Sequence, residues 1–145
     1  MKTRPEPLRV LAILARHGVD SYPRALPDLG AFYRERLPSA RCEVLVVDNS
    51  GASCTTGPGE PEIIGASDRN REFSSWDAGI AHVGSRIWSF DLVHLVTSAF
   101  RTLYTSYIDR CDERALGLIA GRGAATGHVD YYNEPIDLLG NRSQC

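Results

Sequence analysis

The tripeptide Asp48-Asn49-Ser50, which directly follows an apolar run, carries the sharpest chemical signal in this sequence. A carboxylate at the tip of a strand in a nucleotide-binding sheet can accept hydrogen bonds from a ribose or a base edge. The neighbouring amide and hydroxyl add further polar contacts. The same residues also fit a plain Asx turn that closes the strand. Nucleotide contact and turn formation are therefore the two alternatives for this segment.

A second polar segment begins at Asn70 and Arg71 and leads into an amphipathic stretch that contains Asp77. If this stretch is a helix, its N-terminus favours an anionic group such as a diphosphate. Glu72 is unfavourable for phosphate binding unless Arg71 offsets its charge. The spacing matches neither a P-loop nor the Gly-x-Gly-x-x-Gly fingerprint, so the segment alone does not define a known phosphate motif.

Thr97 and Ser98 end a further apolar run, at a position where a metal-dependent enzyme would be expected to carry carboxylates. Magnesium and manganese prefer hard oxygen ligands, and two hydroxyls are poor substitutes. This puts a bound Mg²⁺ or Mn²⁺ ion in doubt, and we predict no metal ligands. Near the C-terminus, Asp130 and Glu134 belong to a polar and aromatic cluster that could supply a general base or form a surface loop.

The order of the apolar runs predicts a sheet that brings these segments together. Short, nearly continuous apolar runs are typical of strands buried on both faces, and apolar residues at i, i+3 and i+4 indicate helices. We expect strands at 8–14, 42–47, 62–65, 90–96 and 115–120, and helices at 26–37, 74–83 and 100–111. The second helix is expected to bury Phe73, Trp76, Ile80 and Val83. The alternation predicts an α/β, Rossmann-like, three-layer fold with a mostly parallel sheet that binds ligands at the carboxyl ends of its strands.

Composition and charge exclude several classes of protein. A charged fraction of 23% with 43% hydrophobic residues is ordinary for a globular domain, and the net charge of -2 shows no basic excess, so we expect no nucleic-acid partner. The four cysteines, Cys42, Cys54, Cys111 and Cys145, are too widely spaced for a zinc motif. We interpret Cys42 and Cys111 as buried free thiols and expect a cytoplasmic protein.

Three regions are expected along the chain: a disordered N-terminus at 1–7, an α/β domain at 8–120, and the start of an acceptor-side region at 121–145 that is cut short. A partial domain of this kind would leave an apolar face uncovered. Such a face leads us to consider a homodimer.

At this point two segments resemble family 2 glycosyltransferases, which have the GT-A fold. EVLVVDNSG is similar to their second strand, which carries Asp-Asn or Asp-Asp followed by Ser. IIGASDRNREFSSWDAGI is similar to their third strand and to the Asn-x-Gly-x-x-x-x-Asn-x-Gly segment that opens the next helix. The resemblance covers residues 8–100 and implies the N-terminal part of a GT-A fold, which binds a nucleotide sugar.

Carried over position by position, the resemblance implies that Asp48 contacts the base, with Asn49 and Ser50 beside it. Asn70 would lie at the base of the third strand, and Asp77 would replace the second asparagine of the family segment. The chain also departs from the family. Glu72 stands where glycine is preferred, and FDLVHLVTSAF lacks the Asp-x-Asp metal motif.

The resemblance implies transfer of a sugar from a nucleoside-diphosphate sugar to an unknown acceptor such as a glycan or a lipid-linked glycan, with inversion of the anomeric centre. A metal, Arg69 or Arg71 would stabilise the leaving phosphate, and Asp130 or Glu134 would deprotonate the acceptor. Two alternatives stay open. One is a catalytically inactive or fragmentary domain that binds a nucleotide or a partner, and the other is an unrelated α/β hydrolase or nucleotidyltransferase.

Overall fold

Four parallel strands form the centre of the structure, a computed structural model that describes residues 6–17, 20–51, 57, 59–103, 110 and 112–127. These strands are β1 (Arg9–Arg16), β2 (Arg41–Asp48), β3 (Glu62–Gly65) and β4 (Leu92–Thr97). They lie in the order β3-β2-β1-β4, and each neighbouring pair is parallel. Rossmann sheets share this order, in which the direction of winding reverses between the first and fourth strands.

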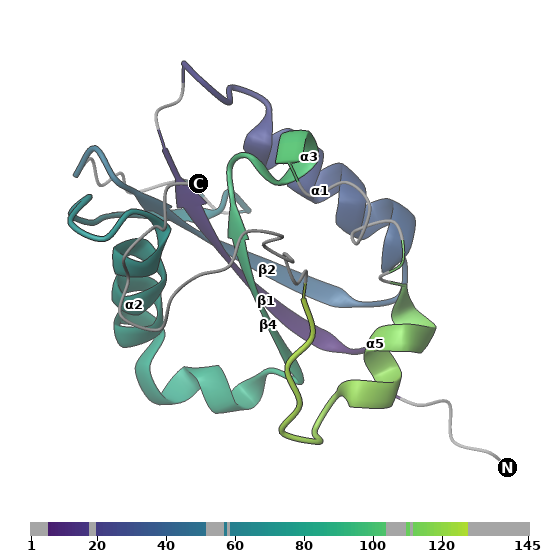
Figure 1. Ribbon diagram of the computed structural model, residues 1–145. Coiled ribbons are helices and arrows are strands. Elements are labelled where there is room, and N and C mark those ends of the chain that lie inside the picture. Colours follow the sequence, from purple (N-terminus) through teal and green to yellow (C-terminus); the bar gives the residue numbers. More distant parts are fainter. Residues whose placement is uncertain are drawn as a thin grey trace, which may run out of the picture.

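Helices cover both faces of this sheet. On one face lie α1 (Ala25–Arg36) and the short α3 (Phe100–Leu103), and on the other lies α2 (Glu72–Val83), which continues into the 3-10 helix η1 (Gly84–Ser89) (Figure 1). This arrangement confirms the predicted α/β fold with three layers. Of the helix expected at 100–111, the structure describes α3, and residues 104–109 and 111 lie outside the described residues.

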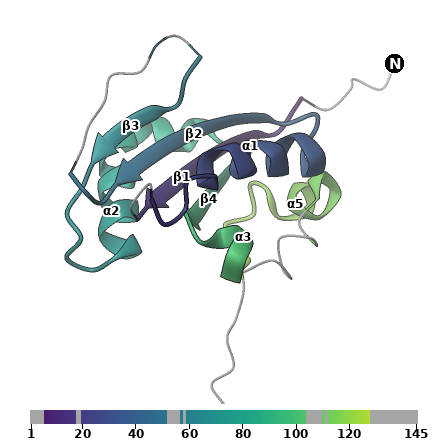
Figure 2. The same cartoon turned by 90° about the horizontal axis from the view of Figure 1, so that it is seen from above.

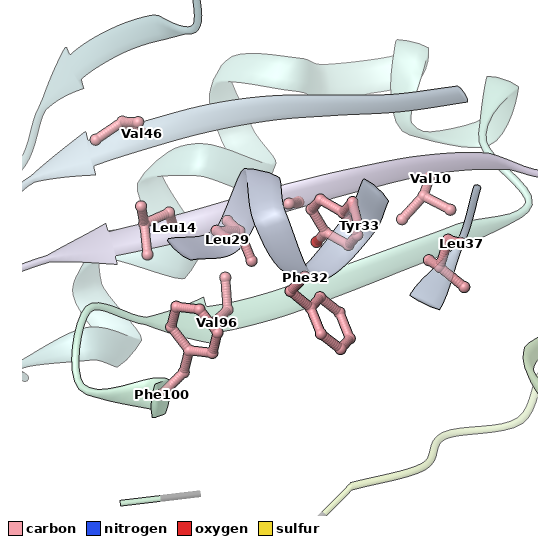
Figure 3. Close-up of a cluster of buried hydrophobic side chains, with 10 residues drawn as sticks. Val10, Leu14, Leu29, Phe32, Tyr33, Leu37, Val46, Val96 and Phe100 are labelled. Atoms are coloured by element: carbon pink, nitrogen blue, oxygen red, sulfur yellow. The ribbon is translucent and has the colours of Figure 1, made fainter. Parts of the chain in front are cut away.

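β1 is the central strand, and its side chains alternate between two cores. Val10, Ala12 and Leu14 pack against α1, together with Leu29 and Phe32 of that helix (Figure 3). Leu11 and Ile13 face the other way and join the cluster beneath α2. A strand that must fill both cores needs apolar side chains at every position, which is why this run lacks alternation.

The packing of α2 differs from the sequence prediction. Phe73 is 63% exposed and Ile80 is 39% exposed, whereas Ser75, Gly79 and Val83 form the buried side. The helix lies so close to the sheet that a Cβ on Gly79 would stand 2.6 Å from Cγ2 of Ile13. Small residues therefore make the closest contacts with the sheet. Phe73 and Ile80 are turned outward, whereas Val83 is buried as predicted and Trp76 is partly buried against the same core.

The strand expected at 115–120 is also wrong, because this segment is helical. It forms α5 (Glu113–Ile119), and the side chain of Asp112 accepts a hydrogen bond from the backbone N of Ala115 at 2.8 Å. Aspartate is a favoured N-cap, and a capped run rich in Ala and Leu favours a helix. Glu113 accepts hydrogen bonds from the backbone N of Ser39 and of Ala40, so α5 contacts the turn that precedes β2, at the amino end of that strand.

The remaining sequence predictions fall partly inside the described residues. Cys42 is a free, partly buried thiol, and burial followed by the charge of Glu113 raises its pKa to about 11. Cys54, Cys111 and Cys145 lie outside the described residues, as do 1–5 of the expected N-terminal region and 128–145 of the expected acceptor-side region. Within the described part of the chain, no helix is long and apolar enough to cross a membrane.

Apolar side chains remain exposed beside β4. Val93 and Leu95 alternate with the inward-facing residues of this strand, and each is 40% exposed. β4 is the last strand of the described sheet on this side. Association of two copies of the chain through this exposed apolar face stays a prediction.

Candidate functional site

The carboxyl ends of β1, β2 and β3 meet at one edge of the sheet (Figure 2). The register pairs Arg16 with Asp48 and Asp48 with Gly65, so the ends of these three strands are level. On the other side of β1, Ala15 is paired with Thr97 of β4. In open parallel sheets, ligands bind outside this edge, at the point where the strand order reverses. Here that point lies between β1 and β4.

Asp48 ends β2 and is enclosed by hydrogen bonds. Its Oδ2 accepts from Nε of Arg16 at 2.7 Å and lies 2.5 Å from Nη2 of the same guanidinium. Its Oδ1 accepts from the backbone N of Ser50 at 2.8 Å and from Oγ of Ser50 at 2.5 Å. Burial alone would raise the pKa of Asp48, but the bonds from Ser50 and then Arg16 outweigh it and hold the pKa below its ordinary value.

The segment from Asp48 to Gly51 is a turn, as the sequence predicted. The backbone N of Gly51 donates to the carbonyl of Asp48 at 3.1 Å, and Gly51 has a φ of 79°. The end of β3 comes so close that a Cβ on Gly65 would collide with the backbone of Gly51. These residues therefore form the turn, which presents Asn49 at the edge of the sheet, and nucleotide contact by the same residues stays a prediction.

Asn49 connects three elements of this edge. Its Oδ1 accepts a hydrogen bond from Oγ of Ser75 on α2, and its Nδ2 donates to Oδ1 of Asp68 at 3.2 Å. The same Nδ2 lies 3.1 Å from both ring nitrogens of His17. The amide thus joins the residue after β1, the loop after β3 and the first turns of α2.

The ends of β1 and β4 are also tied together. The backbone N of His17 donates to Oγ of the buried Ser98 at 3.2 Å, and the backbone N of Ser98 donates to the carbonyl of Ala15 at 3.0 Å. His17 Nδ1 stands 3.8 Å from Oδ1 of Asp68, whose side chain is largely exposed. His17 therefore lies at the reversal of the strand order, and the carboxylate of Asp68 lies near its ring.

The Asn70 segment lies next to this cluster but contributes exposed side chains. The backbone N of Asn70 donates to Oγ of Ser74 at 2.8 Å, and Asn70 and Arg71 are both exposed. Arg71 adopts a φ of 53°, the one positive φ among the described residues other than glycine. Asp77 is exposed on α2, whereas the side of that helix that reaches Asn49 carries Ser75.

The structure thus brings most of the predicted site residues to one edge. Asp48, Asn49, Ser50 and Ser98 are linked through the contacts above, Thr97 adjoins Ser98, and the Asn70 segment joins through Asp68. Asp77 takes no part in this network of described contacts. The candidate bases Asp130 and Glu134 lie outside the described residues.

Four members of the cluster are not among the site residues predicted from the sequence: Arg16, His17, Asp68 and Ser75. Arg16 carries the opposite charge to its register partner Asp48, and aligning the ends of the first two strands would have paired them. The contact of Ser75 with Asn49 depends on how closely α2 approaches the sheet. No local pattern encodes that approach.

The described residues at this edge offer few suitable ligands for a metal ion. The described residues contain no group of three or more His, Cys, Asp or Glu side chains arranged to hold a metal ion. The hydroxyl of Ser98 already accepts a hydrogen bond from His17. Neutral hydroxyls of this kind do not fit the charged oxygen set that magnesium or manganese prefers.

Comparison of the chain with protein-family models, with curated proteins and with solved structures finds no match.

Proposed function

We propose that this edge binds a nucleoside-diphosphate sugar, and that the chain is the donor-binding part of a GT-A-type glycosyltransferase. The observation that best supports this proposal is the position of Asn49, which joins the end of β2 to the loop after β3 and to α2. The two segments that resemble family 2 glycosyltransferases are therefore neighbours in space. Had they lain on different edges, they could not share one ligand.

The chemistry of the edge suits a nucleotide. Hydroxyl, amide and imidazole groups from four elements converge there, and a ribose or base offers matching donors and acceptors. Arg16, Arg69 and Arg71 belong to the same edge and its adjoining loop, where a diphosphate needs positive charge. These residue types recognise both parts of the proposed ligand.

In the proposed reaction, the acceptor hydroxyl attacks the anomeric carbon as the bond to the diphosphate oxygen breaks, which inverts that centre. The electron pair leaves on the diphosphate, and arginine N–H groups stabilise the developing charge. A base takes the proton of the acceptor, and Asp130 and Glu134 remain the proposed candidates. Because Thr97 and Ser98 do not fit a metal, no step in this proposal depends on one.

A second candidate is binding of a nucleotide without turnover. One observation favours it: the described side chains of His17, Asp68 and Ser75 already contact the amide of Asn49, so this part of the edge is arranged for holding a ligand rather than for proton transfer. Calorimetry separates the two functions, since binding without product formation supports the second.

The test is a panel of UDP-, GDP- and dTDP-sugars. Binding is measured by calorimetry, and sugar release is measured with and without manganese. We expect saturable binding of at least one donor, slow release of its sugar, and loss of both in Asn49→Ala. No binding of any donor by the folded wild-type chain would remove the proposal. Release of phosphate from esters without a sugar donor would favour a hydrolase.

A further inference from the structure

We propose that the guanidinium of Arg16 is the phosphate-binding group of this edge, and that Asp48 is a positioning residue that holds it. The inference rests on the proposed nucleotide-sugar site and changes the part that Asp48 plays in it. Asp48 would act on the ligand through Arg16 rather than by contacting the base.

The hydrogen-bonding capacity of Asp48 is already used. An ionised carboxylate has about four lone-pair sites, two on each oxygen. Ser50 occupies both sites on Oδ1 through its backbone N and its hydroxyl. On Oδ2, Nε of Arg16 donates a hydrogen bond and Nη2 of the same guanidinium lies 2.5 Å away. The side chain of Asp48 is 4% exposed. A base edge would have to displace one of these bonds to reach the carboxylate.

The guanidinium of Arg16 has hydrogen-bond donors that its pair with Asp48 does not use. Both of its contacts with Asp48 go to a single oxygen through one side of the guanidinium, so Nη1 is free of that pair. Its side chain is 19% exposed, against 4% for Asp48, so Arg16 is the member of the pair that solvent reaches more readily. The planar fork of arginine matches the oxygens of a phosphate. A fork already held by Asp48 loses little freedom when it binds one.

The position of Arg16 in the sheet also suits a phosphate. It ends β1, the strand that borders the reversal of the strand order, where ligands bind in open parallel sheets. Arg69 and Arg71 are exposed residues of the loop before α2. Arg16 is the arginine of this edge whose orientation is set by a buried partner.

Arg16→Gln tests the inference, with Arg41→Gln as the matched control, because Arg41 is an exposed arginine at the opposite, amino end of β2. Calorimetry measures binding of inorganic diphosphate, of UDP, GDP and dTDP, and of the corresponding nucleosides. We expect Arg16→Gln to weaken diphosphate and nucleoside diphosphates by about 10- to 100-fold, which is the worth of one charge-assisted hydrogen bond, and to leave nucleosides unchanged. Arg41→Gln should match wild type throughout.

Two further variants, Asp48→Asn and Arg16→Lys, test whether Asp48 acts on the ligand through Arg16. Asp48→Asn should weaken nucleoside diphosphates less than Arg16→Gln does, without affecting nucleosides, because the guanidinium remains but is held less firmly. Arg16→Lys should recover part of the diphosphate binding, and it serves as the test variant if Arg16→Gln does not fold. A direct contact of Asp48 with the base would instead make Asp48→Asn lose nucleoside and nucleoside diphosphate binding alike.

The outcomes distinguish this inference from the proposed function. Nucleotide binding that Arg16→Gln leaves intact, or that weakens equally for nucleoside and diphosphate, overturns the inference and keeps the function. Arg16-dependent binding of inorganic diphosphate without binding of any nucleotide sugar keeps the inference and removes the function. A folded wild-type chain that binds none of the probes overturns both.

Discussion

The hydroxyl of Ser75 on α2 donates a hydrogen bond to Oδ1 of Asn49, the residue that follows β2. Ser75 is fully buried, so this bond is shielded from water. It also sets the orientation of the amide, because Oδ1 faces the helix while Nδ2 faces Asp68 and His17. The helix and the edge of the sheet are therefore coupled through one side chain.

Replacing Asn49 with alanine should remove this coupling. The Ser75 hydroxyl would be left buried without its acceptor, at a cost of about 1 to 3 kcal/mol in the free energy of unfolding. Chemical denaturation of Asn49→Ala, Ser75→Ala and the double variant measures it. Because the two residues share one bond, the double variant should lose less than the sum of the single losses. Strict additivity would show that the bond does not form.

The close approach of α2 gives a second prediction. Gly79→Ala should destabilise the chain by about 1 to 3 kcal/mol, because the added methyl group would stand 2.6 Å from Ile13 and 3.2 Å from Val47. Gly117→Ala in α5 is the matched control: a Cβ there meets nothing within 4 Å, and alanine favours a helix by up to about 1 kcal/mol. Thermal unfolding should show opposite shifts for the two variants.

Asp48 should contribute stability that depends on pH. Its pKa is lowered in the fold, so the unfolded chain, with a pKa near 3.8, binds the proton more tightly. The stabilisation is therefore present above pH 3.8 and lost as the pH falls through the lower, folded value. Asp48→Asn should reduce stability near neutral pH by about 2 kcal/mol, and the difference from wild type should shrink in acid. Asp77→Asn, at an exposed position of α2, is the control and should change the free energy of unfolding little near neutral pH.

His94 should show a pH dependence in a different window. The ring lies between β4 and α1, where Nδ1 is 2.7 Å from the hydroxyl of Tyr33, and desolvation lowers its pKa from 6.5 to about 4. The unfolded chain takes up the proton first, so stability should fall as the pH drops from about 6.5 to 4. The loss should amount to about 1 to 3 kcal/mol, reduced by the partial exposure of the residue. Denaturation of His94→Gln should lack this component, and a wild-type slope retained in the variant would contradict the assignment.

The layout of the sheet was largely predictable from sequence. Buried parallel strands read as apolar runs, so β1 to β4 were located to within about two residues at each end, and α1 was recognised from its spacing. At two places the spacing of the apolar residues led to a wrong prediction. In α2 the tight packing selects Gly79 and Ser75 for the inner side, and the apolar residues Phe73 and Ile80 are exposed. In the segment 115–120, a short apolar run was interpreted as a strand, and the Asp112 cap that makes it a helix was overlooked.

The sequence predicted where the candidate site lies, but it did not predict which of the site residues contact one another. Because Asp48 and Asn70 each follow a strand of one parallel sheet, their proximity to a common edge could be expected. The ion pair of Arg16 with Asp48 depends on the register of two strands, which the sequence of either strand alone does not specify. The resemblance assigned Asp48 to the base, whereas the structure surrounds its carboxylate with Arg16 and Ser50.

The most direct test of the account is to map where a nucleotide binds. Backbone amide spectra of the ¹⁵N-labelled chain would be recorded during titration with UDP, GDP or dTDP. We predict shifts concentrated at Arg16, His17, Ser98 and residues 48–50 at the carboxyl edge, with little change at Arg41 and α5. Shifts centred on the amino edge, or a folded chain whose spectrum no nucleotide alters, would contradict it.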